Sequence, residues 1–188
     1  YVQFLGGEFI KHGAQQVATN TITDPHFPGF ENLGTSFAFH EEWYSMKDFT
    51  PDIHVLTVIN SPAMKGEEYE RPPYPITWAR QEGQGRVWYT AIGHREDVWT
   101  NPIFKQMLIG GIKWALGDAK ANVAPNLKQT APGAYTNPPY PEPKPKAAAA
   151  SIKPSAPSVL NLSFQEADAE PMLIDHKPQL PPGVEDID

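Results

Sequence analysis

Three polar residues of the chain could carry acid–base chemistry. His12 follows a Gly-Gly turn, Glu42 precedes two aromatic residues, and His94 ends an expected strand just before a loop and a helix. Imidazole and carboxylate groups exchange protons near neutral pH, and both also bind divalent metals. We therefore predict that His12, Glu42 and His94 form either a catalytic acid–base set or a mixed His/carboxylate metal site, with His12 and His94 as the metal ligands.

A structural role is the alternative for each candidate. A histidine at a strand end is often a hydrogen-bonded structural residue, and Glu42 could simply pair with Arg86 or Arg95. Trp43 and Tyr44 could offer aromatic faces to a sugar ring, and they could equally be core or interface residues. We interpret Trp43, Tyr44 and Arg95 as substrate-binding candidates.

The composition argues against several other kinds of site. Without cysteine, the chain has no thiolate nucleophile, disulfide or zinc-thiolate site. It has no P-loop and no Gly-x-Ser-x-Gly elbow, and Gly83-Gln84-Gly85 lies in an expected hairpin turn rather than opening a helix. We therefore expect no nucleotide cofactor, whereas a divalent metal stays open.

The charge and the hydropathy pattern bear on the partners. A net charge of −7 argues against binding to nucleic acid through its phosphates. No run of 18 apolar residues occurs, so we expect no transmembrane segment.

The apolar pattern predicts an α/β unit over residues 1–120. Strands are expected over 14–24, 36–40, 52–59, 75–80 and 86–92, the last two as a hairpin. The nearly continuous apolar run at 52–59 indicates a strand buried on both faces, with His54 as a hydrogen-bonded core residue. A short helix is expected over 2–5, ended by Gly6.

The clearest expected helix covers residues 102–116. Asn101 is a good N-cap, Pro102 fits the first helical position and Gly117 fits the C-terminal cap. Gly110 and Gly111 inside it indicate close packing on a neighbouring sheet. Residues 60–74, with Glu67, Glu68, Glu70 and Arg71, are expected to form a solvated surface loop.

Residues 121–188 are expected to form an extended Pro-rich tail. They hold 13 of the 21 prolines and none of the five tryptophans. Two short apolar patches interrupt the tail, and we predict that residues 126–188 bind another protein chain through them. The predicted anchors are Leu160, Leu162, Phe164, Leu173 and Ile174.

Six segments in order resemble the ThuA-like (trehalose-utilisation) family. They are LGGEFIKH (5–12), TDPHFP (23–28), EEWY (41–44), PITW (75–78), GQGRVWYTAIGH (83–94) and GGIKWALG (110–117). The resemblance implies a flavodoxin-like fold related to class I glutamine amidotransferases, with a mostly parallel sheet, helices on both faces and a ligand site at the carboxyl ends of the strands. Two departures are Gly13, where the family often has Pro, and the shifted position of His26.

The resemblance covers the C-terminal half of the family domain, so we expect a partial domain. It implies action on a sugar, of the trehalose or keto-sugar type, by acid–base or metal-assisted chemistry. Two alternatives remain: a non-catalytic scaffold anchored in a larger complex by its Pro-rich tail, and a carbohydrate-binding module. For an enzyme of this kind, a periplasmic or secreted location is favoured over the cytoplasm.

Overall fold

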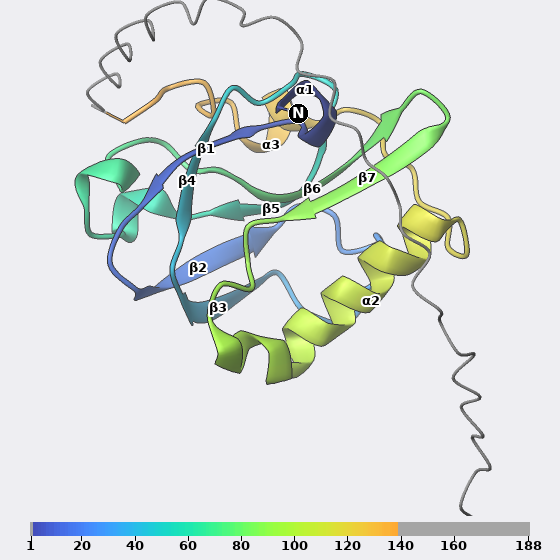
Figure 1. Ribbon diagram of the computed structural model, residues 1–188, viewed down its shortest axis with the longest axis horizontal. Helices are drawn as coiled ribbons and strands as arrows, with labels where there is room; N and C mark the ends of the chain where they lie inside the picture. The colour runs from blue at the N-terminus through green and yellow to red at the C-terminus, as the bar shows by residue number, and fades with distance from the viewer. Residues whose placement is uncertain (1, 139–188) are drawn as a thin grey trace, which may run out of the picture. The chain divides into compact units, whose positions relative to one another are not determined.

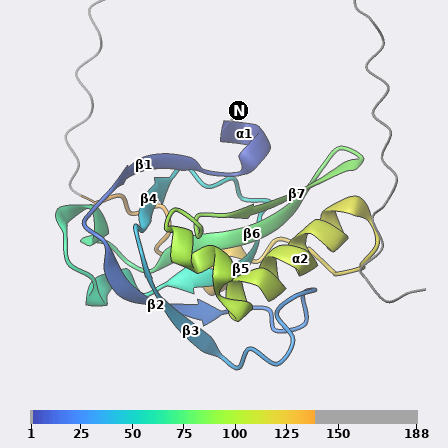
Figure 2. The ribbon, with the colours of Figure 1, turned by 60° about the horizontal axis from the view of Figure 1, so that its bottom comes forward.

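The computed structural model describes residues 2–138, which form a curved antiparallel sheet, a smaller two-stranded sheet and one long helix (Figures 1 and 2). The five strands of the main sheet run in the order β3-β2-β5-β6-β7, and β1 pairs with β4 beside it. The bounds are α1 Val2–Leu5, β1 Glu8–His12, β2 Gln16–Ile22, β3 Ser36–Glu41, β4 Tyr44–Lys47, β5 His54–Ile59, η1 Ser61–Ala63, η2 Glu67–Tyr69, β6 Tyr74–Glu82, β7 Gly85–Thr90, η3 Glu96–Thr100, α2 Pro102–Leu116 and α3 Leu127–Thr130.

All five predicted strands of the main sheet are present, and their burial follows the sequence pattern. In β2, Ala18, Asn20 and Ile22 are buried while the residues between them are exposed, as period-two alternation requires. Every residue of β5 is buried, which confirms the interpretation of its continuous apolar run. His54 in this strand is also buried, and its ring nitrogens contact the Ala124 carbonyl at 2.7 Å and Asp24 at 3.0 Å.

The strand directions differ from the expectation of a mostly parallel sheet. Every strand pair in residues 2–138 is antiparallel. Parallel neighbours need a long crossover, usually a helix, whereas β6 and β7 are joined by the two residues Gly83 and Gln84 and the long helix α2 comes only after the last strand. The architecture of this part of the chain is therefore mixed but rich in strands.

Helix α2 packs against β7, and its ends are fixed as the sequence predicts. The Asn101 side chain accepts a hydrogen bond from the Ile103 amide, and Gly117 ends the helix with φ of 93°. The two internal glycines allow close approach. A Cβ at Gly110 would lie 2.1 Å from the Pro28 carbonyl oxygen, and one at Gly111 would lie 2.3 Å from the Trp88 ring.

Residues 60–74 are only in part the solvated loop that their charges suggested, because Glu67 and Glu70 are exposed but two other charged residues are not. Glu68 and Arg71 are buried. The Arg71 guanidinium donates to the Met46 carbonyl and, at 2.6 Å, to the Ala134 carbonyl, and Glu68 lies 3.1 Å from the Lys11 ammonium. These charged side chains are inside because each reaches a partner on another segment.

The residues just after position 120 also pack onto the sheet. The Asn126 side chain accepts from the Val55 amide at 2.6 Å and donates to the Val55 carbonyl at 3.1 Å. Leu127, Ala131 and Ala134 are buried. This segment therefore belongs to the same compact unit as the strands.

None of the helices within residues 2–138 is long and apolar enough to cross a membrane. The predicted partner-binding residues Leu160, Leu162, Phe164, Leu173 and Ile174 lie outside the described residues.

The close approach of α2 predicts that Gly110→Ala lowers the free energy of unfolding. The new methyl group meets the backbone of residues 28 and 29, which no side-chain rotation can relieve. We expect a loss of about 2 kcal/mol, although alanine is intrinsically the better helix former by about 1 kcal/mol. Urea unfolding measures the change, with Ile112→Ala on the exposed side of α2 as the control. An increase in stability for Gly110→Ala would contradict this packing.

Candidate functional site

Three separate segments bring His12, Glu42 and His94 together. His12 is the last residue of β1, Glu42 lies between β3 and β4, and His94 lies in the loop between β7 and η3. The pairing of β1 with β4 sets His12 opposite Tyr44, two residues beyond Glu42. The clustering predicted from sequence is therefore present in the structure.

The Glu42 carboxylate bridges the two histidines. Its Oε1 lies 2.5 Å from Nδ1 of His12, and its Oε2 lies 2.9 Å from Nδ1 of His94. The two imidazole rings are 6.3 Å apart between centroids and inclined by 28°. We name these three residues the histidine–glutamate cluster.

The cluster is open on the side of the histidines. The Glu42 side chain is 12% exposed, whereas those of His12 and His94 are 48% and 46% exposed. Because Nε2 lies across each ring from Nδ1, the carboxylate holds the inner nitrogens and leaves the outer edges of both rings toward solvent. The alternative partners of Glu42 are engaged elsewhere: Arg86 donates to the Trp114 carbonyl and Arg95 pairs with Asp97.

Glu41, which the sequence analysis did not single out, positions His94. It is fully buried, and its carboxylate accepts from the amides of Gly93 at 2.9 Å, Arg95 at 3.0 Å and Glu42 at 2.8 Å. These bonds fix the backbone on both sides of His94. The sequence does contain a signal for the burial of Glu41. Side chains of a strand over 36–41 alternate between its two faces, which places residue 41 on the same buried face as Phe37 and Phe39.

The Tyr69 hydroxyl links the two chain segments that follow His12 and Glu42. Its hydroxyl donates to the Trp43 carbonyl at 2.6 Å and accepts from the Gly13 amide at 2.9 Å. Burial raises the pKa of Tyr69 to about 12, the Gly13 amide opposes this shift, and the nearby carboxylates of Glu68 and Glu42 add to it. The phenol is therefore a neutral bridge between the chain after His12 and the chain after Glu42.

The two predicted aromatic ligand-binding residues have different environments. Trp43 is fully buried, and its indole donates to the Gln16 carbonyl at 2.9 Å, so its ring packs in the core. Tyr44 is half-buried, and its ring centroid lies 6.4 Å from that of His12 and 6.2 Å from that of His94. Burial and the carboxylates of Glu42 and Glu41 raise the pKa of Tyr44, so this wall of the site is uncharged at neutral pH.

Arg95 lies in a polar hollow next to His94. The hollow has a volume of about 420 Å³ and is lined by Gln15, His94, Arg95, Glu96 and Asp97. The Arg95 guanidinium contacts Asp97 at 2.9 and 3.1 Å and also donates to Gln15. Hydrogen bonding to Asp97 raises the pKa of Arg95, and the same contact lowers the pKa of Asp97.

The described residues do not fit a metal centre. Within residues 2–138, no group of three or more His, Cys, Asp or Glu side chains is arranged to hold a metal ion. Nδ1 of both His12 and His94 faces the Glu42 carboxylate at hydrogen-bond distance rather than a shared central point.

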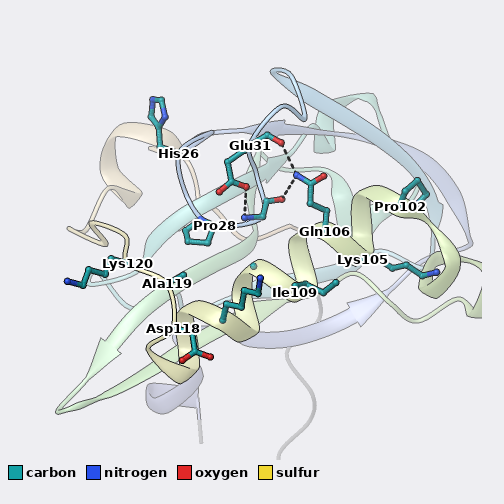
Figure 3. Close-up of a pocket in the computed structure, with 13 residues that line it drawn as sticks. His26, Pro28, Glu31, Pro102, Lys105, Gln106, Ile109, Asp118, Ala119 and Lys120 are labelled. Carbon is teal, nitrogen blue, oxygen red and sulfur yellow. Dashed lines mark hydrogen bonds between the residues drawn. The ribbon is translucent and has the colours of Figure 1, made fainter. Parts of the chain in front are cut away.

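Another hollow, of about 830 Å³, lies along α2 (Figure 3). Gln106 closes one side by donating to the carbonyls of Gly29 at 3.2 Å and Glu31 at 2.8 Å. None of its lining residues belongs to the histidine–glutamate cluster or to the polar hollow.

The sequence of residues 1–115 matches the ThuA family, described as trehalose utilisation. The chain therefore belongs to this family.

Among solved structures, the chain is similar to two proteins described as ThuA-like. One is from Bacteroides uniformis ATCC 8492, with 20% identity, a TM-score of 0.49, and coverage of 65% of this chain and 53% of that one. The other is from Parabacteroides merdae ATCC 43184, with 20% identity, a TM-score of 0.44, and coverage of 72% and 48%. The chain thus spans about half the length of these two proteins. None of the curated proteins compared with the chain matches it.

The Tyr69 bridge predicts a pH-dependent loss of stability in alkaline solution. A folded-state pKa near 12 exceeds the ordinary value of 10.0, so the contribution of the phenol is complete below pH 10 and is lost as the pH rises through 12. Over this window the free energy of unfolding falls by about 1.4 kcal/mol per pH unit for one such group. We expect Tyr69→Phe to remove this component, as measured by urea unfolding at a series of pH values.

The control for this experiment is Tyr135→Phe, because Tyr135 is exposed. An unchanged pH dependence in Tyr69→Phe would show that the phenol does not titrate in this window.

The Glu41 bonds predict that Glu41→Gln both destabilises the protein and releases His94. An amide offers one acceptor oxygen, and its NH₂ group faces a backbone donor, so at least one amide loses its partner. We expect a loss of about 2 kcal/mol in the free energy of unfolding. NMR should show a larger shift change for the His94 ring than for the His12 ring. Glu70→Gln, at an exposed position, is the control, and equal changes at both histidines would contradict the assignment.

Proposed function

We propose that the histidine–glutamate cluster is a general acid–base site acting on a sugar or keto-sugar. The observation that carries the proposal is the bridging of two half-exposed imidazoles by one nearly buried carboxylate. Membership of the trehalose-utilisation family supports a sugar as the substrate class. Because the chain spans about half of its structural relatives, the activity of the whole protein is part of the proposal.

In this proposal, the Glu42 carboxylate selects the tautomer of both rings through its contacts with their Nδ1 atoms. An ionised carboxylate only accepts hydrogen bonds, so Nδ1 of each histidine donates to Glu42. Nδ1 of His12 also faces the Gly13 carbonyl at 3.2 Å, which is a second acceptor. A neutral histidine of this tautomer carries its lone pair on the outward Nε2 and acts as a base, and a protonated one acts as an acid.

Two such rings 6.3 Å apart can act on neighbouring atoms of one substrate. On a keto-sugar, Nε2 of the neutral ring takes the proton from the carbon next to the carbonyl. The C–H electron pair becomes the double bond of an enediol, and the protonated ring delivers its proton to the carbonyl oxygen. Glu42 stabilises whichever ring is charged, because it contacts both.

The polar hollow suits the hydroxyl groups of such a substrate. Gln15, Arg95 and Asp97 offer both donors and acceptors within the hollow that His94 also lines. A non-catalytic scaffold or a carbohydrate-binding module would need a folded surface here, but neither would need paired Nδ1 contacts to one carboxylate.

Proton exchange with solvent tests the proposal directly. In D₂O, the protein should catalyse deuterium incorporation next to the carbonyl of a keto-hexose or keto-disaccharide, measured by loss of the ¹H NMR signal. We expect His12→Ala, His94→Ala and Glu42→Gln each to lower this rate by about 10²–10⁴-fold, since Glu42→Gln no longer fixes both tautomers.

Glu70→Gln is the matched control for Glu42→Gln and should keep the rate, because Glu70 is exposed and outside the cluster. No exchange above the buffer rate across a panel of keto-sugars, or exchange that survives His94→Ala, would overturn the proposal.

A further inference from the structure

We propose that an apolar hollow beside the histidine–glutamate cluster binds an uncharged aryl or alkyl substituent of the substrate. This inference rests on the proposed function and specifies the substrate class: a sugar that carries an apolar group. The hollow has a volume of about 410 Å³, and its lining includes Leu5, Glu8, Phe9, Tyr44, Met46 and Tyr89. We name it the aromatic hollow.

The aromatic hollow shares a wall with the reacting groups. Tyr44 lines it and also lies about as far from the His12 ring as from the His94 ring, at 6.4 and 6.2 Å between centroids. Phe9 lines it too, meets Tyr44 edge-on at 4.8 Å and lies 6.4 Å from His12. A ligand held in the hollow would therefore contact Phe9 and Tyr44, the two lining residues whose rings lie beside the imidazoles.

A β-bulge places Phe9 on this side. Phe9 and His12 are three residues apart, so regular alternation would send their side chains to opposite faces. The pairing of β1 with β4 shifts register between Phe9 and Lys11, and the extra residue brings the Phe9 and His12 rings to the same side. Bulges often re-aim side chains next to active sites, and this one leaves Phe9 46% exposed at the hollow.

The other walls are preformed. The Tyr89 ring stacks on Trp78 at 4.2 Å between centroids, and its hydroxyl lies 3.8 Å from the Met46 sulfur. Met46 is 1% exposed and pairs with Phe9 across the two strands. Side chains fixed in this way lose little freedom when a ligand binds.

The charge of the hollow selects an uncharged substituent. Glu8 is the only ionisable acid or base among its lining residues apart from the tyrosine phenols, and its carboxylate lies 3.6 Å from the Lys47 ammonium. A phosphate or carboxylate would meet the like charge of Glu8, whereas an aromatic ring or alkyl chain would bury apolar area against Leu5, Phe9 and Met46.

The first test uses benzyl alcohol, a probe without a sugar. Titration should shift the Met46 methyl signal in NMR spectra and leave that of Met107, which is buried elsewhere in the core. Phe9→Ala should weaken binding at least about 5-fold through lost apolar contact. Phe4→Ala is the matched control, since Phe4 is 52% exposed and does not line the hollow. Leu5→Ala, a second variant at the hollow, should also weaken binding.

The second test compares methyl and benzyl β-D-glucoside. Benzyl should bind at least about 10-fold more tightly to the wild type, and Phe9→Ala should remove most of this difference. No Met46 shift with benzyl alcohol, equal binding of the two glucosides, or equal effects of Phe4→Ala and Phe9→Ala would overturn the inference.

These results are separable from the acid–base proposal. Benzyl alcohol binding that persists in His94→Ala, together with absent deuterium exchange on keto-sugars, would defeat the proposed function alone. Deuterium exchange that depends on His94, with no Met46 shift, would defeat only the inference on the aromatic hollow.

Discussion

The site depends on the buried carboxylate of Glu41. An unpaired charge at full burial would cost several kcal/mol, and three backbone amides compensate for that cost by donating to this one group. Two of them flank His94, so the end of β3 and the loop after β7 are held together. The same loop is also held by the Trp99 indole, which donates to the Gly93 carbonyl at 2.9 Å, and by the contact of the His94 ring with Glu42. The position of His94 therefore depends on the buried charge of Glu41 as well as on the contacts of the loop itself.

Because Glu41 and Glu42 are adjacent, one strand end supplies both the buried carboxylate that holds the loop after β7 and the carboxylate that contacts the two histidines. Glu41 continues the buried face of β3, and the next side chain lies at the two histidines. His12 arrives from β1, which is held by pairing with β4, and the Tyr69 hydroxyl links the amide after His12 to the carbonyl after Glu42. Four segments distant in sequence therefore converge through polar contacts, each of which satisfies a buried or partly buried group.

Much of the fold could be predicted from local patterns, because alternation, caps and glycines act over a few residues. The five strands of the main sheet and α2 follow from such signals. Strands β1 and β4 could not be predicted from such signals, because they are short and contain the charged residues Lys11 and Lys47. They form by pairing with each other, although more than thirty residues separate them in the sequence. The burial of Glu68 and Arg71 also depends on distant partners. The three residues of the histidine–glutamate cluster could be predicted from their types and from the family resemblance. The bridging of the two histidines by Glu42 could not, because it depends on the fold. Glu41 was missed, although the alternation of side chains along 36–41 places it on the buried face.

The polar hollow, which His94 lines, and the aromatic hollow, which Tyr44 lines, differ in polarity, and under the proposed function this difference would orient a substrate. Apart from His94, the charged residues of the polar hollow are one cation, Arg95, and two anions, Glu96 and Asp97, and the guanidinium is already engaged by Asp97. A phosphate group would meet two carboxylates and a guanidinium that Asp97 already engages, whereas neutral hydroxyl groups would find donors and acceptors. On the other side, the raised pKa of Tyr44 keeps the shared wall uncharged. Under the proposed function, a substrate would place its hydroxyl groups in the polar hollow, which His94 also lines, and its apolar group against Phe9 and Tyr44, whose rings lie beside the imidazoles.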